Sequence, residues 1–409
     1  MDIRIHPDAA AEALLSLARP PEAEEVALGA ALRRVAAEEL RAVLPNPPFR
    51  RSAYDGYALF SADTRDASEA SPAVFRVSGE LPAGCAPAGR LARGDAVRSL
   101  TGAPVPEGAD AVVPKERTMP DGEGRVRVFA ALRPGENVAP VGEDVRPGEL
   151  LISGGERLGP AALGLAAGQG LDTLRVFRRP RLALISTGSE LLRPGEAPED
   201  GKIYHTNLFT LGAYLELLGA AAADGGLVGD DAAAVAAAIE RALPGHDAVL
   251  LTGGASVGEY DFTLAAMRRL GGRILFHRTA MKPGGAMLAA EIGGKAVIGL
   301  SGNPGAAALG LLRVAAPFVK ALAGRRELFW PRAELLLKKP LLKPSPQMRL
   351  LRGRLEIEGG RAFFSENGRQ QNGAVSSLSG CDLIGEISAG SPPLPAGAAI
   401  SAFRIMEGV

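Results

Sequence analysis

The sequence predicts a multidomain α/β protein, and three observations lead to that prediction. The chain has 409 residues, more than one ordinary domain contains, so we expect two to four domains. From residue 178 onward, short apolar strands alternate with amphipathic helices, which is the pattern of a parallel, layered α/β domain. Between residues 49 and 145, short alternating stretches are separated by Gly and Pro clusters, which indicates a small β-rich unit.

The N-terminal part of the chain is predicted to be helical. Apolar residues recur at helical spacing over 8–40, so we expect two helices there, ended by the Pro-rich run at 45–48. A further helix is expected over 160–170, because Pro160 suits a first helical position.

The α/β region is expected to hold two buried strands, two amphipathic helices, a hairpin and a long apolar helix. In chain order these are the strand 182–186, the helices 206–219 and 231–243, the strand 247–251, the hairpin of 286–290 with 296–300, and the helix 304–323. From residue 328 the chain is Pro-interrupted and strand-like, so we expect it to end in a small β unit.

The composition excludes several classes of function. Lys plus Arg and Asp plus Glu number 46 each, so no overall basic field attracts nucleic acid or an anionic membrane surface. Cys85 and Cys381 lack metal-ligand spacing, and the N-terminus lacks the basic-then-apolar order of a signal peptide. Charged residues and Pro317 interrupt the apolar stretch 306–323, so we expect a packed helix there and no membrane span. A reduced, cytoplasmic protein fits these features.

Two polar, Gly-containing loops follow predicted strands of the α/β region. Ligands of open parallel sheets bind beyond the carboxyl ends of the strands, where glycines let backbone N–H groups approach an anion. We therefore expect a phosphate to bind at these loops, although structural turns would explain the same glycines. The candidate residues are Thr187 and Gly188 in the first loop and Thr252, Gly253, Gly254 and Ser256 in the second.

Acidic residues lie around the same strand ends. Carboxylates beside a phosphate repel it unless a divalent cation lies between them, and Mg²⁺ is commonly held by one or two carboxylates plus phosphate oxygens. Helix N-capping is the alternative role, and we favour it for Asp231. We favour Mg²⁺ binding for Glu190 and Asp261, and Asp230 belongs to the same cluster.

Two more segments can meet an anion. Arg278 and Lys282 lie four residues apart at the end of an expected strand, where they either clamp an anionic ligand or form a solvated edge. Gly302, Asn303 and Pro304 precede the long helix, whose N-terminus can attract an anion, or they are only a strand-to-helix turn.

Taken in chain order, these segments resemble the MoeA family, which includes the gephyrin E domain. The segment 47–58 reads PPFRRSAYDGYA and is similar to the family's first signature, with Tyr54 in place of Met. The segments 101–113 and 142–148 are similar to its second and third signatures. The Thr-Gly-x-Glu, Thr-Gly-Gly-x-Ser-x-Gly-Glu-x-Asp and Gly-Asn-Pro elements follow in order, so the resemblance covers most of the chain.

The resemblance implies four domains and an elongated homodimer. The N-terminal domain would comprise 1–45 and 146–177, with a β-rich domain inserted at 46–145. A three-layer α/β domain of the MogA type, which binds molybdopterin, would follow at 178–327, and a small β-barrel domain at 328–409. The active cleft would lie between the α/β domain of one subunit and the inserted domain of the other.

The resemblance also implies an activity in molybdenum cofactor biosynthesis. The family hydrolyses adenylated molybdopterin with Mg²⁺, releases AMP and transfers molybdate to the dithiolene sulfurs, in contact with other proteins of the same biosynthesis. Glu190 and Asp261 would hold Mg²⁺, the loop 252–256 would bind a phosphate, and Lys282 would offset negative charge. The other positions that carry over are Asp55, Thr101, Asp144, Asp230 and Arg278, and, by a loose match to oxyanion contacts, Arg352 and Ser376.

Two departures from the family pattern concern the oxyanion. Gly285 stands where the family has a second lysine, and Ala306 stands where it has a serine. A lost charge-assisted hydrogen bond weakens the binding of a dianion by about 1.5–3 kcal/mol. Two alternatives to a molybdate transferase therefore stay open: a paralogue with another oxyanion choice, such as tungstate, and a non-catalytic scaffold.

Overall fold

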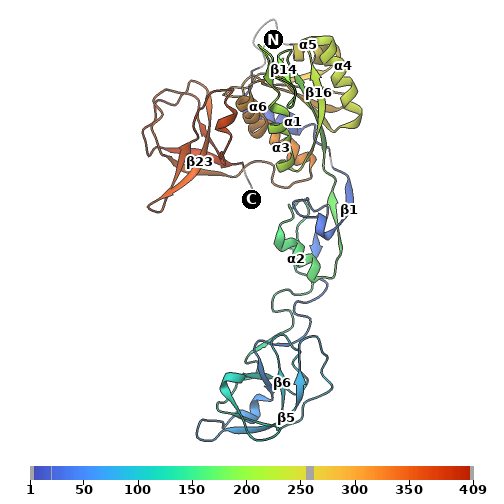
Figure 1. Cartoon of the computed structure of the whole chain (residues 1–409), viewed down its shortest axis with the longest axis vertical. Helices are drawn as coiled ribbons and strands as arrows, with labels where there is room; N and C mark the ends of the chain where they lie inside the picture. The colour runs from blue at the N-terminus through green and yellow to red at the C-terminus, as the bar shows by residue number, and fades with distance from the viewer. Residues whose placement is uncertain (1–3, 20, 255–261, 406–409) are drawn as a thin grey trace. The chain divides into compact units, whose positions relative to one another are not determined.

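The computed structural model describes residues 4–19, 21–254 and 262–405 of the chain. The chain divides into two compact units (Figure 1). Unit 1 comprises Met1–Glu38, Gly154–Gly159 and Thr173–Val409, and unit 2 comprises Glu39–Ser153 and Pro160–Asp172.

Unit 2 is built on a six-stranded sheet in the order β7-β4-β6-β5-β9-β8, which confirms the predicted β-rich unit. One face buries Leu59, Phe75, Val126 and their neighbours in a small apolar core. The strands are β4 (Gly56–Leu59), β5 (Ala73–Leu81), β6 (Asp95–Ser99), β7 (Ala111–Pro114), β8 (Thr118–Pro120) and β9 (Arg125–Val128).

Short antiparallel pairs extend this unit. The predicted helix at Pro160 is confirmed as α2 (Pro160–Gly168). Two pairs join segments distant in sequence: β2 (Leu40–Arg41) with β11 (Leu150–Ile152), and β3 (Arg51–Ser52) with β10 (Val138–Ala139).

The prediction of two helices over 8–40 is half wrong. The first is present as α1 (Pro7–Leu15). In place of the second, β1 (Ala23–Ala27) pairs antiparallel with β12 (Thr173–Phe177), and only a short 3₁₀ turn, Leu28–Ala30, follows. The strand forms despite its helix-favouring composition because a partner far along the chain supplies the ladder, and tertiary pairing outweighs local propensity.

Unit 1 contains a second six-stranded sheet, in the order β16-β13-β17-β21-β20-β18. The first four strands are parallel to one another, which confirms the layered α/β prediction, and β20 and β21 form the predicted antiparallel hairpin. The strands are β13 (Arg181–Thr187), β16 (Ala221–Val228), β17 (Ala248–Thr252), β18 (Arg273–His277), β20 (Leu288–Ile292) and β21 (Lys295–Leu300).

Strand β16 was missed by the sequence analysis. Its residues are mostly Ala and Gly, which lack the β-branched signature of a strand. Gly225 is needed at this position because a Cβ there would lie 2.6 Å from Ile185 Cγ1, beside the shift in register between β13 and β16. The close approach of two backbones therefore explains the composition.

Helices cover both faces of this sheet, as strand alternation requires (Figure 1). Leu182 and Leu184 of β13 pack in one core with α1 and α3 (Asn207–Leu218), whereas Ala183 and Ile185 pack in the other. The second core contains α4 (Ala232–Ala242) and α5 (Phe262–Arg269). The result is a three-layer arrangement, which confirms the layered α/β domain predicted from the strand and helix order and the three layers that the resemblance implied.

The apolar stretch 304–323 forms one helix, made of α6 (Pro304–Gly310), a π-helical turn (Leu311–Ala315) and α7 (Ala316–Leu322). It is long and apolar enough to cross a membrane by length and composition, but 94% of the relevant window is buried inside the protein. The prediction of a packed helix is therefore confirmed. Arg313, in the π turn, is buried against Asp8 and Glu386.

The C-terminal β unit is also confirmed, as a closed ring of strands. β23 pairs with β24, β24 with β22, β22 with β26, β26 with β25, and β25 with β23. The short β19 (Met281–Lys282) pairs with β23 and so attaches the Lys282 segment to the barrel. The barrel strands are β22 (Arg332–Leu337), β23 (Met348–Glu358), β24 (Arg361–Glu366), β25 (Leu383–Ile387) and β26 (Ala399–Arg404).

The buried ion pair between Arg313 and Glu386 generates a stability prediction. Both side chains are at most 9% exposed, so Glu386→Ala leaves a buried guanidinium with Asp8 as its remaining acidic partner and should destabilise unit 1 by about 1–3 kcal/mol. The thermal unfolding midpoint of the transition of unit 1 measures the loss. Glu38→Ala, which removes the exposed pair with Arg175 in the same unit, is the control and should change little. Equal shifts in the two variants would contradict the assigned role of burial.

Candidate functional site

A cavity of about 1140 Å³ lies in unit 1, where β13, β17 and β21 end. Because these parallel strands are neighbours, the loops that follow them converge at one edge of the sheet. The structure thus brings together most of the residues predicted from the strand-end loops. They are Thr187, Gly188 and Glu190 at the end of β13, Asp230 after β16, Thr252, Gly253 and Gly254 at the end of β17, and Gly302, Asn303 and Pro304 after β21.

The loop at 252–254 needs its glycines because it packs closely against the loop at Thr187. Gly253 and Gly254 have φ values of 88° and 63°, which favour glycine. A Cβ on Gly253 would lie 2.2 Å from the carbonyl oxygen of Thr187. These glycines therefore do form a structural turn, which was the alternative role considered for them. The turn brings the backbone of this loop to the cavity wall.

Two carboxylates line this cavity. Asp230 Oδ2 accepts hydrogen bonds of 3.3 Å from the backbone N–H and the hydroxyl of Ser189. The Glu190 side chain folds back over its own loop, and its Oε2 would lie 2.6 Å from a Cβ on Gly188. Asp231 instead caps α4 by accepting from Ala234 N at 2.7 Å, as predicted. Asp261 and Ser256 lie outside the described residues.

A buried chain of three polar side chains underlies the cavity, and sequence reasoning missed it. Ser186 Oγ is hydrogen-bonded to His205 Nε2 and lies 3.0 Å from Thr252 Oγ1. Burial lowers the pKa of His205 below its usual value. His205 belongs to none of the predicted motifs, although it lies between β15 (Ile203–Tyr204) and α3 and so reaches the cavity from a loop.

Asn207 is a second residue of this cavity that was missed. Its Nδ2 donates to the carbonyl of Gly302 at 2.9 Å. Its Oδ1 is buried and has no hydrogen-bond partner in the described part of the chain. An unsatisfied buried acceptor beside a cavity indicates a place for a donor from a ligand or from water.

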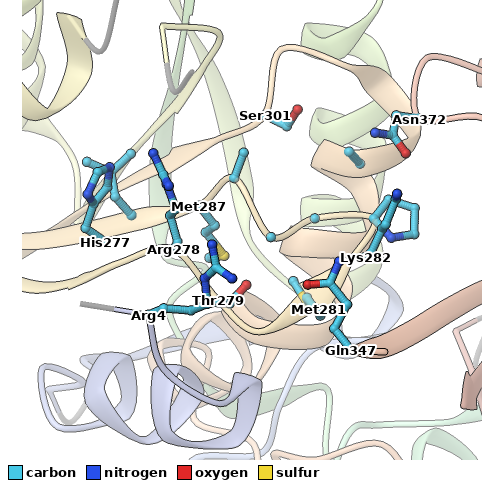
Figure 2. A pocket seen from close by; sticks show the side chains of 16 residues that line it. Arg4, His277, Arg278, Thr279, Met281, Lys282, Met287, Ser301, Gln347 and Asn372 are labelled. Atoms are coloured by element: carbon cyan, nitrogen blue, oxygen red, sulfur yellow. The ribbon is translucent and has the colours of Figure 1, made fainter. Parts of the chain in front are cut away.

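A smaller cavity of about 230 Å³ lies next to the first and carries positive charge. Figure 2 shows Arg4, Arg278 and Thr279 on one side of it, with Lys282, Gln347 and Asn372 on the other. Ser301 lines both cavities. The two predicted cations, Arg278 and Lys282, are therefore brought to one hollow and not to a flat solvated edge.

The backbone at Arg278 is strained. Its φ is 83°, in the left-handed region that a non-glycine residue rarely adopts. The N-terminal segment holds this loop, because Ile5 N donates to Arg278 O at 3.2 Å and Ala280 N donates to Ile5 O at 2.8 Å. This pairing also brings Arg4 to the cavity, which no local sequence signal indicated. Strain of this kind is commonly retained at functional positions.

Both departures from the family pattern line this cationic cavity. Gly285 and Ala306 belong to its wall. A Cβ on Gly285 would lie 2.4 Å from the carbonyl oxygen of Met281 and 2.9 Å from that of Thr279. A lysine therefore cannot be placed at position 285 without a shift of the backbone.

Arg352 and Ser376, which match the family's oxyanion contacts only loosely, differ in their surroundings. Arg352 lies on β23 and is fully buried, burial lowers its pKa, and its Nη1 has no partner among the described residues. That nitrogen lies against the first turn of α6, where a Cβ on Gly305 would be 2.1 Å away. Ser376, in the 3₁₀ turn Val375–Ser377, is exposed.

The remaining predicted residues lie in unit 2. Asp55 accepts hydrogen bonds from the backbone N–H and the hydroxyl of Thr101, at 2.8 and 2.7 Å, and these bonds lower its pKa. Asp144 Oδ2 accepts from Asn46 Nδ2 at 3.0 Å. Thr101 also lines a cavity of about 530 Å³ in this unit, together with Arg51, Asn137 and Glu143.

Family models match two long parts of the chain. Residues 5–170 match the MoeA N-terminal region, described as domains I and II. Residues 183–321 match a probable molybdopterin binding domain. The second match contains the strand-end loops and the two predicted cations of the smaller cavity, Arg278 and Lys282.

Relatives and solved structures agree with these matches. A molybdopterin molybdenumtransferase of Bacillus subtilis is 32% identical over 94% of this chain and 90% of its own length. A protein of the same name from Staphylococcus aureus is 32% identical over 91% of this chain and 88% of its own length. The crystal structure of a molybdopterin biosynthesis MoeA protein from Pyrococcus horikoshii is 31% identical, with a TM-score of 0.82 over 99% of this chain and 100% of that one. The chain belongs to the MoeA family of molybdopterin molybdenumtransferases.

Proposed function

We propose that this protein is a molybdopterin molybdenumtransferase that acts on adenylated molybdopterin. The observation that carries the proposal is the pair of adjoining cavities in unit 1. One is lined by glycine loops, hydroxyls and carboxylates, and the other by arginine and lysine. The substrate carries a pterin and a pyrophosphate, and it reacts with an oxyanion. The reaction therefore needs one cavity for the pterin nucleotide and an adjoining cavity for the oxyanion.

The larger cavity supplies the binding groups that a pterin nucleotide requires. Its volume of about 1140 Å³ is at the upper end of small-molecule sites, which suits a dinucleotide-like ligand. Backbone N–H groups at Gly253, Gly254 and Gly302 and the hydroxyls of Thr187 and Thr252 donate to phosphate oxygens. The apolar side chains of Leu191, Ile203, Phe262 and Val375 supply flat contact area for a heterocycle.

The carboxylates fit a divalent cation. Glu190 and Asp230 line a cavity whose other polar groups suit phosphate, and Mg²⁺ needs only one or two carboxylates when phosphate oxygens complete its shell. We propose that Glu190 holds the ion with Asp261, and that Asp230 fixes the loop through Ser189. When bound, Mg²⁺ would neutralise charge on the phosphate oxygens during hydrolysis of the adenylate linkage.

The cationic cavity is the proposed oxyanion site. Arg278 and Lys282 bind the dianion and offset its charge, and Ser301 connects this cavity with the first. The buried guanidinium of Arg352 adds a donor that has no described protein partner. The exposed Ser376 is proposed as a weaker contact of the same oxyanion.

Further parts of the proposal rest on the family resemblance. They are the four-domain division, the homodimer, the cytoplasmic location, the contacts with other molybdenum cofactor proteins, and roles for Asp55, Thr101 and Asp144 in completing the active cleft. The hydrogen bonds of Asp55 with Thr101 support a preorganised carboxylate at that position.

A direct assay tests the proposed reaction. The wild-type protein should release AMP from adenylated molybdopterin only when Mg²⁺ and molybdate are both present. Glu190→Gln should raise the half-saturating Mg²⁺ concentration by more than about 10-fold, because changes to outer-shell partners alone cost about 10–100-fold. The control is Glu240→Gln, on the exposed side of α4. Absence of AMP release by the wild type under these conditions would refute the transferase activity.

The altered wall of the cationic cavity favours a second candidate, a transferase with another oxyanion choice. Ala306→Ser is the suitable test, because its Cβ is already accommodated, whereas Gly285→Lys would clash with the backbone. A restored hydroxyl donor should lower the half-saturating molybdate concentration about fivefold, equivalent to about 1 kcal/mol. Half-saturation is measured for molybdate and tungstate in both proteins. If tungstate is preferred by the wild type, the altered choice is supported, and if Ala306→Ser changes neither value, the hydroxyl does not matter here.

A further inference from the structure

The floor of the larger cavity contains a histidine whose environment is unusual. His205 is 4% exposed and lines the cavity between β15 (Ile203–Tyr204) and α3. Its Nε2 is hydrogen-bonded to Ser186 Oγ, which in turn lies 3.0 Å from Thr252 Oγ1. Thr252 also lines the cavity. The three side chains therefore form one buried chain that begins and ends at residues on the cavity wall.

The number of protons on this chain limits what it can donate. Each hydroxyl has one hydrogen, and a neutral imidazole has one N–H. If Ser186 donates to His205 Nε2, then Thr252 donates to Ser186, and only His205 Nδ1–H can donate to a ligand. If His205 donates from Nε2, the bonds run the other way and only the Thr252 hydroxyl can donate outward. A neutral chain thus offers one outward donor.

A protonated His205 removes this restriction. The imidazolium donates from both nitrogens, so Nδ1–H can donate to a ligand while Nε2–H donates to Ser186, Ser186 to Thr252, and Thr252 outward. The chain then offers two donors and a positive charge, which suits an anion in a poorly solvated cavity.

Charged groups around His205 do not fix its state in advance. Burial lowers its pKa most strongly, Asp224 raises it and Arg193 lowers it. Arg193 and Asp224 pair with each other at 3.1 Å and act on this pKa in opposite directions. Glu190 and Asp230 line the same cavity as negative groups. In the free protein, burial therefore favours the neutral imidazole.

We infer that His205 binds a proton when an anionic phosphate group of the ligand occupies the cavity, and that the resulting imidazolium donates to this group directly and through Ser186 and Thr252. The inference rests on the proposed function, since that function supplies the anionic ligand. It assigns His205 a binding role and Ser186 a positioning role.

Proton linkage gives the direction of the effect. A ligand that binds the protonated form better raises the pKa of His205, so binding takes up a proton between the free and bound pKa values. Affinity then increases as pH falls through this window, by up to about tenfold per pH unit. Above the bound-state pKa the affinity no longer depends on the protonation of His205.

Calorimetric titration of the wild-type protein with adenylated molybdopterin tests the inference. The titration is run at constant Mg²⁺ and salt, from about pH 5.5 to 8.5, in two buffers of different ionisation enthalpy. We expect proton uptake approaching one per ligand, together with tighter binding at lower pH. His205→Gln, which keeps a donor and an acceptor but cannot titrate, should bind without this uptake. His246→Gln, which replaces a histidine bonded to Ala242 O outside the cavity, should behave as the wild type.

A second measurement covers the case in which His205→Gln fails to fold. The ¹⁵N shifts of His205 in the wild-type protein should change from a neutral tautomer to imidazolium when the ligand is added at pH 7. An unchanged neutral tautomer in the saturated complex, or equal proton uptake by wild type and His205→Gln, would overturn the inference. If the wild type binds no adenylated molybdopterin at any pH, the proposed function itself is wrong, which is a separate result.

Discussion

The parallel pairing of β13 with β17 and of β17 with β21 is the constraint on which the candidate site depends. Its register places Ser186 beside Thr252, and Thr252 beside Leu300, so three loops leave the sheet at one edge. Each loop alone is a common turn. Their convergence creates a cavity wall made of backbone amides, hydroxyls and carboxylates, and it also closes the buried chain from Thr252 to His205.

The cationic cavity depends on contacts between segments that are distant in sequence. The N-terminal segment pairs with the Arg278 loop, and β19 pairs with the barrel strand β23. Unit 1 therefore positions Arg278 and Lys282 from both sides, and the strained φ of Arg278 is held by these pairings. The backbone at Gly285 leaves no room for a Cβ, so a side chain at this position would require the loop to shift.

The sequence predicted the elements whose signals are local. The buried strands at 182–186 and 247–251, the Asp231 cap and the packed helix from Pro304 all follow from apolar periodicity or capping chemistry. The sequence could not predict β1 or β16, because these strands are stabilised by distant partners. It could not predict Arg4 or His205 either, because they reach the cavities only through tertiary pairing. The strand-end loops were found because parallel topology makes their meeting predictable, whereas side-chain contacts between loops are not encoded locally.

Hydrogen–deuterium exchange with and without adenylated molybdopterin tests the central claim most directly. The claim is that the strand ends of β13, β17 and β21 hold the pyrophosphate through backbone amides. Amides at 187–190, 252–254 and 301–303 should therefore become protected together when the ligand is bound, because each would donate to it or be covered by it. Protection confined to other segments of the chain, with these three unchanged, would contradict the account.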